Sequence, residues 1–129
     1  MSVQGDNFRN LAEALDNSSE AVRRVAETAK AAALGGLSPE KRDKLIEGLG
    51  AATSDAARVA AVQKIHDDCV SARDRVIAEL EASGASDLMG TGRLDQEISL
   101  LQGLLGALQA LHTLEIFRDH FRAIASGFD

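Results

Sequence analysis

The sequence predicts an all-α fold, an antiparallel helical bundle of three long helices and one short helix. Composition is the first reason, because the chain contains 22 Ala and 16 Leu but only four aromatic residues, all Phe, which favours helices over sheets. Periodicity is the second reason, since apolar residues recur in steps of three and four along most of the chain. With 129 residues, of which 26% are charged, we expect a single helical-bundle domain over residues 1–129.

The first helix is expected over residues 6–34. Asp6 is a suitable N-cap, and the glycine pair at residues 35–36 is a suitable end, because glycine readily adopts the left-handed conformation that closes a helix. Apolar or small residues repeat through this segment with the heptad period of packed helices. The positions of this predicted seam are Phe8, Leu11, Leu15, Ser18, Val22, Val25, Ala29 and Ala32.

Two further helices are expected over residues 39–49 and 54–82. The tripeptide Ser-Pro-Glu at residues 38–40 is a strong start signal, since it combines a capping hydroxyl, a proline at the first turn and an early acid. Two glycines and several cap-forming side chains at residues 48–54 favour a break over one continuous helix. One helix over residues 39–82 remains the alternative, because the apolar pattern continues through the break.

The last helix, expected over residues 93–127, is apolar around most of its circumference. Residues 98–114 carry no formal charge, but such a stretch falls short of the roughly 20 residues that span a bilayer. We therefore expect a buried central helix without a membrane span, and self-association into a homodimer through its remaining apolar surface. The predicted interaction surface comprises Leu100, Gly103, Leu104, Gly106, Ala110, Leu111, Phe117 and Phe121.

Polar residues on the seam of the third helix raise the question of a metal site. The pairs His66/Cys69 and His112/Glu115 each have i, i+3 spacing, which puts both members on one helix face and makes a four-ligand zinc site conceivable. If the last two long helices are antiparallel around the loop at residues 84–92, Gln63 and His66 lie level with His112. The favoured interpretation is a partly buried hydrogen-bonded group, with no metal expected.

The remaining sequence excludes several classes of function. Neither a Gly-x-Ser-x-Gly nor a His-Glu-x-x-His motif is present, so we expect no enzyme activity and no cofactor. The net charge of −6 is spread over the chain and makes nucleic acid an unlikely partner. Cys69 is the only cysteine, and residues 1–6 contain no apolar signal core, so a cytoplasmic location is expected, although signal-independent export stays possible.

These features favour a non-catalytic protein–protein interaction or assembly module that associates with itself and possibly with another protein. One alternative is a bundle with a buried metal or small-ligand site around His66 and His112. Another is a bacterial secretion-system effector or adaptor. The excess of arginine over lysine, ten against four, is typical of a bacterial or phage protein encoded by GC-rich DNA.

Overall fold

The computed structural model, which describes residues 2–84 and 91–128, confirms the all-α helical bundle. The predicted three long helices and one short helix are present, each within a few residues of its expected bounds, and no strand occurs in these two ranges. The elements are α1 (Val3–Gly36), α2 (Pro39–Ala51), α3 (Asp55–Ala82) and α4 (Gly92–Ser126).

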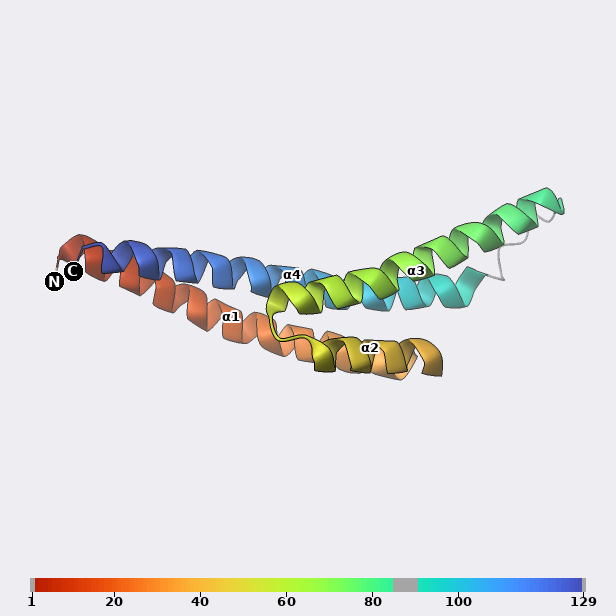
Figure 1. Ribbon diagram of the computed structural model, residues 1–129, viewed down its shortest axis with the longest axis horizontal. Helices are drawn as coiled ribbons and strands as arrows, with labels where there is room; N and C mark the ends of the chain where they lie inside the picture. Colours follow the sequence, from red (N-terminus) through yellow and green to blue (C-terminus); the bar gives the residue numbers. More distant parts are fainter. Residues whose placement is uncertain (1, 85–90, 129) are drawn as a thin grey trace.

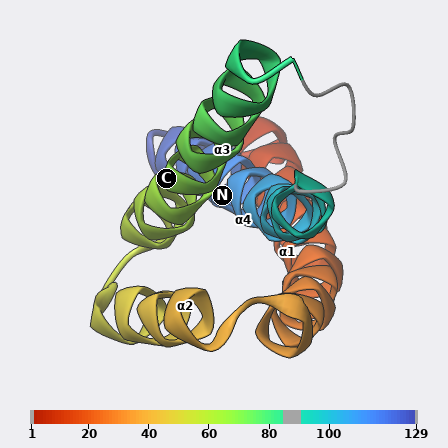
Figure 2. The same cartoon turned by 90° about the vertical axis from the view of Figure 1, so that its right-hand side faces the viewer.

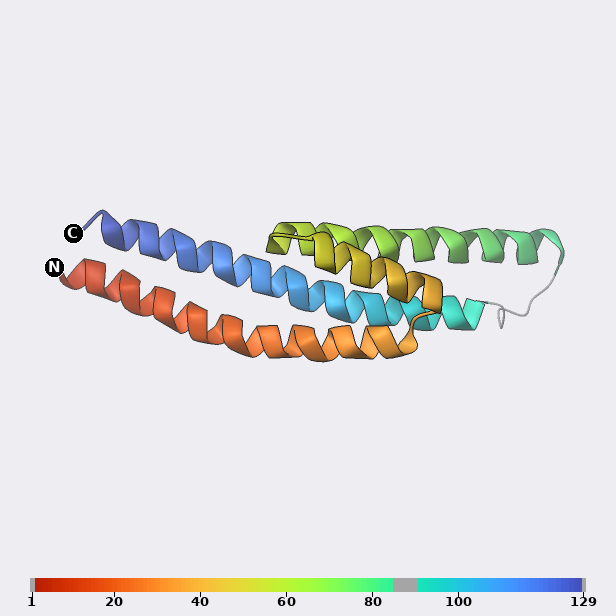
Figure 3. The ribbon, with the colours of Figure 1, turned by 60° about the horizontal axis from the view of Figure 1, so that its bottom comes forward.

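The helices form an elongated molecule with two unlike halves. α1 runs beside α4 in the opposite direction along the whole length of α1, whereas α2 and α3 accompany this pair over one half only (Figures 1 and 3). The end-on view shows α2 turning away from the end of α1 toward α3 (Figure 2). We call α1 residues 3–22 with α4 residues 116–126 the two-helix half, and the rest the four-helix half.

Side-chain caps define where two of the helices begin. The Ser2 hydroxyl accepts a hydrogen bond from the Gly5 amide at 2.9 Å, so α1 begins before Asp6, which lies in the first turn instead of capping it. The Ser54 hydroxyl accepts a hydrogen bond from the Ala57 amide at 3.1 Å and caps α3. The expected break between the second and third helices is therefore confirmed, and the continuous alternative over residues 39–82 is wrong.

The four-helix half contains the main apolar core. Leu45 of α2, Val62 of α3 and Leu101 of α4 are each 0% exposed, so each of these helices places a large side chain in the common centre. On α3 the seam is rotated from the expected one, because Gln63 and His66 are only partly buried, whereas Val62 and Ile65, each one residue earlier, are buried. The buried α3 residues are Val62, Ile65 and Cys69.

The seam of α1 is built from small residues at strict intervals of seven. Its buried residues are Gly5, Ala12, Ser19, Ala26 and Ala33. Small side chains allow two helices to approach closely, and this approach turns Leu11 and Val25 outward, where they are 48% and 60% exposed. The predicted seam was therefore wrong for Leu11, Ser18, Val25 and Ala32, whereas Phe8, Leu15, Val22 and Ala29 flank the true seam and are half-buried.

A buried carboxylate joins α4 to the turn between α1 and α2. Glu97 is 1% exposed and accepts hydrogen bonds from the Ser38 backbone amide and the Lys41 ammonium group, both at 2.9 Å. Burial alone would raise the pKa of Glu97, but these two hydrogen bonds outweigh it and hold the pKa below its usual range. Glu97 thereby fixes the start of α2 against α4, a role that sequence reasoning missed.

Candidate functional site

One side of the α1/α4 pair carries no formal charge along its length. On α1, two columns of residues at intervals of seven are exposed and uncharged, and on α4 two similar columns are exposed or half-buried and uncharged. We call these residues the uncharged face. On α1 they are Asn7, Ala14, Ala21, Thr28 and Gly35, then Leu11, Ser18, Val25 and Ala32. On α4 they are Leu100, Ala107, Leu114 and Phe121, with Phe128 just past the end of the helix, then Gly103, Ala110, Phe117 and Ile124.

Contacts at both ends of the helix pair place these columns on the same side. Near the termini, the Phe8 ring stacks on Phe121 and Phe128, with ring centroids 6.0 and 5.8 Å apart. At the other end, a Cβ atom on Gly36 would collide with the side chain of Leu100. Phe8 and Gly36 belong to one column of α1, so that column packs against the Leu100–Phe128 column of α4. The exposed columns of the two helices lie next to this contact, on the same side of the helix pair.

The structure separates the predicted interaction residues into two groups. Leu104 and Leu111 are buried in the fold, at 1% and 5% exposed, so they are not available to a partner and are corrected to core residues. The others are at least partly accessible, and an added Cβ at Gly103 or Gly106 would meet nothing within 4 Å. The accessible group comprises Leu100, Gly103, Gly106, Ala110, Phe117 and Phe121.

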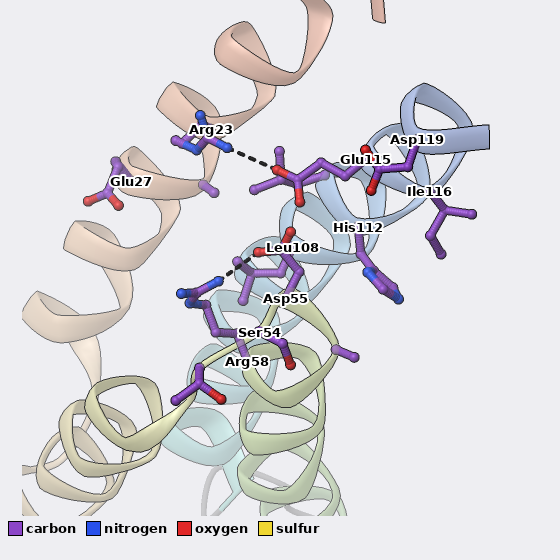
Figure 4. A pocket seen from close by; sticks show the side chains of 14 residues that line it. Arg23, Glu27, Ser54, Asp55, Arg58, Leu108, His112, Glu115, Ile116 and Asp119 are labelled. Atoms are coloured by element: carbon purple, nitrogen blue, oxygen red, sulfur yellow. Dashed lines mark hydrogen bonds and ion pairs between the residues drawn. The ribbon is translucent and has the colours of Figure 1, made fainter. Parts of the chain in front are cut away.

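The opposite side of the α1/α4 pair carries charges and a cavity of about 710 Å³. The cavity lies where α3 begins, and its walls come from α1, the start of α3 and α4 (Figure 4). Ala26, Leu108 and Leu111 give it an apolar floor. Its charged and titratable lining residues are Arg23, Glu27, Asp55, Arg58, His112, Glu115 and Asp119.

Two carboxyl groups in this cavity interact directly. Asp55, the first residue of α3, and Glu115 of α4 lie within hydrogen-bonding reach, and this contact lowers the pKa of Asp55 and raises the pKa of Glu115. Each is also held by an arginine, since Arg58 binds Asp55 at 2.7 Å and Arg23 binds Glu115 at 2.9 Å (Figure 4). The result is a row of four side chains, with the two carboxyl groups in the middle and an arginine at each end, that connects α3, α4 and α1.

Sequence reasoning did not find this cluster as a group. The spacing of Asp55 and Arg58 is a visible i, i+3 pair within one helix, but nothing in the sequence connects it to Glu115 or Arg23. Those two residues meet only because α1 and α4 are antiparallel in one register. Each arginine here is paired with a carboxylate, so the cluster joins the three helices through side-chain contacts.

The expected register between the third and last helices was wrong. Asp55 meets Glu115, and Arg73 lies 3.5 Å from Asp95, so α3 is displaced from the expected level by several residues. The reason is that the end of α3 projects beyond the start of α4 (Figure 1). His112 therefore shares a cavity with Asp55, while His66 lies about 16 Å further along α3 at 1.5 Å per residue.

The four residues considered as metal ligands are consequently not brought together. His66 and Gln63 both contact Asp67 on their own helix, at 3.1 and 2.8 Å, and not His112. Cys69 is buried, and this burial raises the pKa of its thiol. In the part of the chain that the structure describes, no three His, Cys, Asp or Glu side chains are grouped so that they could hold a metal ion.

α4 also meets the length and composition of a membrane-spanning helix. Its most apolar stretch of 18 residues has a mean hydropathy of 1.2, and 28% of that stretch is buried. Leucines of this helix form much of the apolar core, which is equally the behaviour of a central helix in a bundle.

Comparison with protein-family models, curated proteins and solved structures finds no match to this chain. The two surface features of the molecule that bear on its function are the uncharged face and the charged cavity.

Proposed function

We propose that this chain is a non-catalytic interaction and assembly module, and that its partner is a second copy of itself bound through the uncharged face. The observation that carries the proposal is the length of this face, which extends along both α1 and α4 without a formal charge. Exposed large side chains such as Val25 and Phe117, at 60% and 50% exposed, lie on it. Interfaces are depleted of charge at their centres and enriched in aromatic residues.

The size of the face fits a dimer. A helix of 34 residues, the length of α1, is about 50 Å long, and two adjacent helices are about 20 Å wide. One side of the pair thus offers on the order of 1,000 Å², against the roughly 800 Å² that each partner contributes to a standard protein interface. Two copies related by a twofold axis would cover one another's exposed apolar side chains.

Charge also favours a second copy as the occupant. The chain has a net charge of −6, so most contacts between two copies would bring like charges together. The uncharged face avoids this repulsion. Its small residues, including Ala14 and Ala21 on α1 and Gly103 and Ala110 on α4, repeat at intervals of seven and permit close helix crossings between copies.

Light scattering over a concentration series tests the proposal. The wild-type chain should give a dimer mass, and Ala110→Arg should weaken the dimer at least about tenfold, because a buried unpaired charge costs more than about 1.4 kcal/mol. Ala60→Arg is the matched control, since Ala60 is exposed on α3 away from the face, and it should leave the dimer intact. A monomer mass at every concentration would refute self-association, as would an equal loss in both variants.

A flotation assay with uncharged phosphatidylcholine vesicles separates this proposal from membrane binding. The dimer model expects the protein to remain in the lipid-free fraction, because its uncharged face is covered by the second copy. Co-flotation of a monomeric protein that Ala110→Arg abolishes would assign the face to a lipid surface and overturn the dimer proposal. Ala60→Arg again serves as the control.

A further inference from the structure

The start of α3 is attached to the rest of the molecule through a small number of side chains. α3 begins at Asp55 after a connection of only three residues, 52–54, which follows the end of α2. This point is also the boundary where the four-helix half gives way to the two-helix half (Figure 1). The first turn of α3 is therefore covered by fewer neighbouring elements than the middle of the same helix.

Empty space lies on the α1 side of this first turn. The cavity of about 710 Å³ is accompanied by a smaller one of about 110 Å³, and the two share Ala26, Glu27, Arg58 and Leu108 among their lining residues. In the residues that the structure describes, α3 approaches α4 and α2 closely, whereas no close backbone approach joins α3 to α1. The first turn of α3 is consequently held mainly from α4, on which the Asp55–Glu115 contact is its polar attachment.

We propose that the start of α3 is a pH-sensitive clasp, which is docked on α4 while the Asp55–Glu115 pair holds a proton and loosens into the neighbouring cavities when that proton is lost. Two carboxyl groups can share a hydrogen bond only if one of them is protonated. When both are ionised, they repel each other at short range in a partly buried site. The direct link between α3 and α4 then becomes a repulsive contact.

The surrounding charges do not cancel this effect. Arg58 from α3 and Arg23 from α1 compensate part of the negative charge of the two carboxylates. Arg23 compensates less than a full charge, because it also binds Glu20. The further groups that face the pair are negative or mixed in sign. They are Glu27 from α1 and His112, Arg118 and Asp119 from α4, and the pair Arg118/Asp119 is itself joined at 3.0 Å.

The direction of the pH dependence follows from Glu115. Its pKa is raised, first by the contact with Asp55 and then by burial, whereas the pKa of Asp55 is lowered. A raised folded-state pKa gives a stabilisation that is complete below the ordinary glutamate value and is lost as the pH rises through the raised value. Asp55 stays ionised in this range, so the clasp closes as the pH falls toward the ordinary glutamate value and opens as the pH rises through the raised value.

Hydrogen exchange measured by mass spectrometry between about pH 4.5 and about pH 7.5 tests the clasp. After correction for intrinsic exchange, amides of residues 55–60 should lose protection as the pH rises, by up to about tenfold for each unit by which the pKa of Glu115 is displaced. Amides of residues 65–75 should not follow this trend. The full chain is used, at one concentration, so that its association state is constant.

Amide variants identify the carboxyl pair as the cause. Asp55→Asn supplies an N–H donor to Glu115 at every pH, and Glu115→Gln does the same for Asp55, so both should abolish the pH dependence. Glu13→Gln is the matched control, because Glu13 is exposed on the outer side of α1, and it should retain the wild-type profile. A flat profile in the wild type, or a pH dependence that survives in Asp55→Asn, would overturn the proposal, and Asp55→Asn alone suffices if Glu115→Gln does not fold.

Discussion

The two halves of this molecule are stabilised in different ways. In the four-helix half, large side chains such as Leu45, Val62 and Leu101 are withdrawn completely from water. In the two-helix half, the buried seam positions of α1 are Gly5, Ala12 and Ser19, which have little apolar surface to bury. Since the hydrophobic contribution scales with buried apolar area, at about 25 cal/mol per Å², the four-helix half supplies most of the stability.

Ring stacking and ion pairs replace a deep core in the two-helix half. Phe8 stacks on Phe121 and Phe128, and Arg118 bridges Asp16 and Asp119, each at 3.0 Å. The hydrogen bonds that Arg118 donates to Asp119 and then to Asp16 raise the pKa of Arg118. Because surface ion pairs contribute at most about 1 kcal/mol each, the stability of the two-helix half depends on its continuity with the four-helix half. Close packing of small residues thus sets the geometry of this helix pair without giving it independent stability.

Truncating one leucine in each half gives the largest expected difference. Leu101→Ala removes a side chain that is 0% exposed and should lower the free energy of unfolding by about 3–5 kcal/mol. Leu15→Ala removes the same atoms from a half-buried position of the two-helix half and should lower it by about 1 kcal/mol. Urea denaturation of both variants measures this, and equal losses would contradict the comparison.

Glu97 provides the second test, because its polar contacts lie in the four-helix half. Glu97→Gln should lower the free energy of unfolding by about 2 kcal/mol at neutral pH, since it weakens charged hydrogen bonds to Lys41 and Ser38. The lowered pKa of Glu97 means that its stabilisation is present above the ordinary glutamate value and is lost as the pH falls through the lowered value. Thermal melts of the variant should therefore show a weaker acid destabilisation than the wild type.

Glu40→Gln is the control for this measurement. Glu40 lies in the first turn of α2, next to Lys41, but its contact with Lys44 is exposed. Its loss should change stability by less than about 0.5 kcal/mol. If the two variants gave the same pH profile, Glu97 would not be the anchor of α2.

A small-to-large substitution tests the packing of the two-helix half and has the smallest expected effect. Ala12→Leu places a bulky side chain at a seam position that is 2% exposed and should cost about 1–2 kcal/mol through overpacking. Ala31→Leu, at an exposed position of the same helix outside the uncharged face, should change stability by less than about 0.5 kcal/mol. Far-UV circular dichroism during thermal unfolding compares them, and a neutral Ala12→Leu would mean that α1 and α4 are not closely packed.

Local signals in the sequence predicted much of this fold, but they predicted less well which side chains each helix buries. Caps, glycines and the Ser-Pro-Glu start located all four helices, because these signals act within a few residues. The heptad period of α1 was also correct, but the period alone does not determine which column of α1 packs against α4. Leu11 and Val25 looked like seam residues because they are large, whereas the real seam uses Gly5 and Ala12, whose small size brings α4 close.

Contacts between helices were beyond the reach of the sequence pattern. The level at which α3 meets α4 depends on how far α3 projects past the turn, so Asp55 rather than His66 lies beside His112. Glu97 appeared as one more polar residue on an apolar helix, and only the path of the α1–α2 turn makes it a buried anchor. Long-range partners of charged residues are set by tertiary register, which no local spacing encodes.

Both ends of the described chain lie at the same end of the molecule, at the tip of the two-helix half (Figure 1). Tension applied between Ser2 and Phe128 would therefore separate α1 from α4 sequentially, beginning at this end, with the load on one helical turn at a time. The Phe8 stack would yield first, and the buried leucines of the opposite half would carry load only after the part of the small-residue seam in the two-helix half had separated. The molecule is thus mechanically soft from its ends, wherever its thermal stability resides.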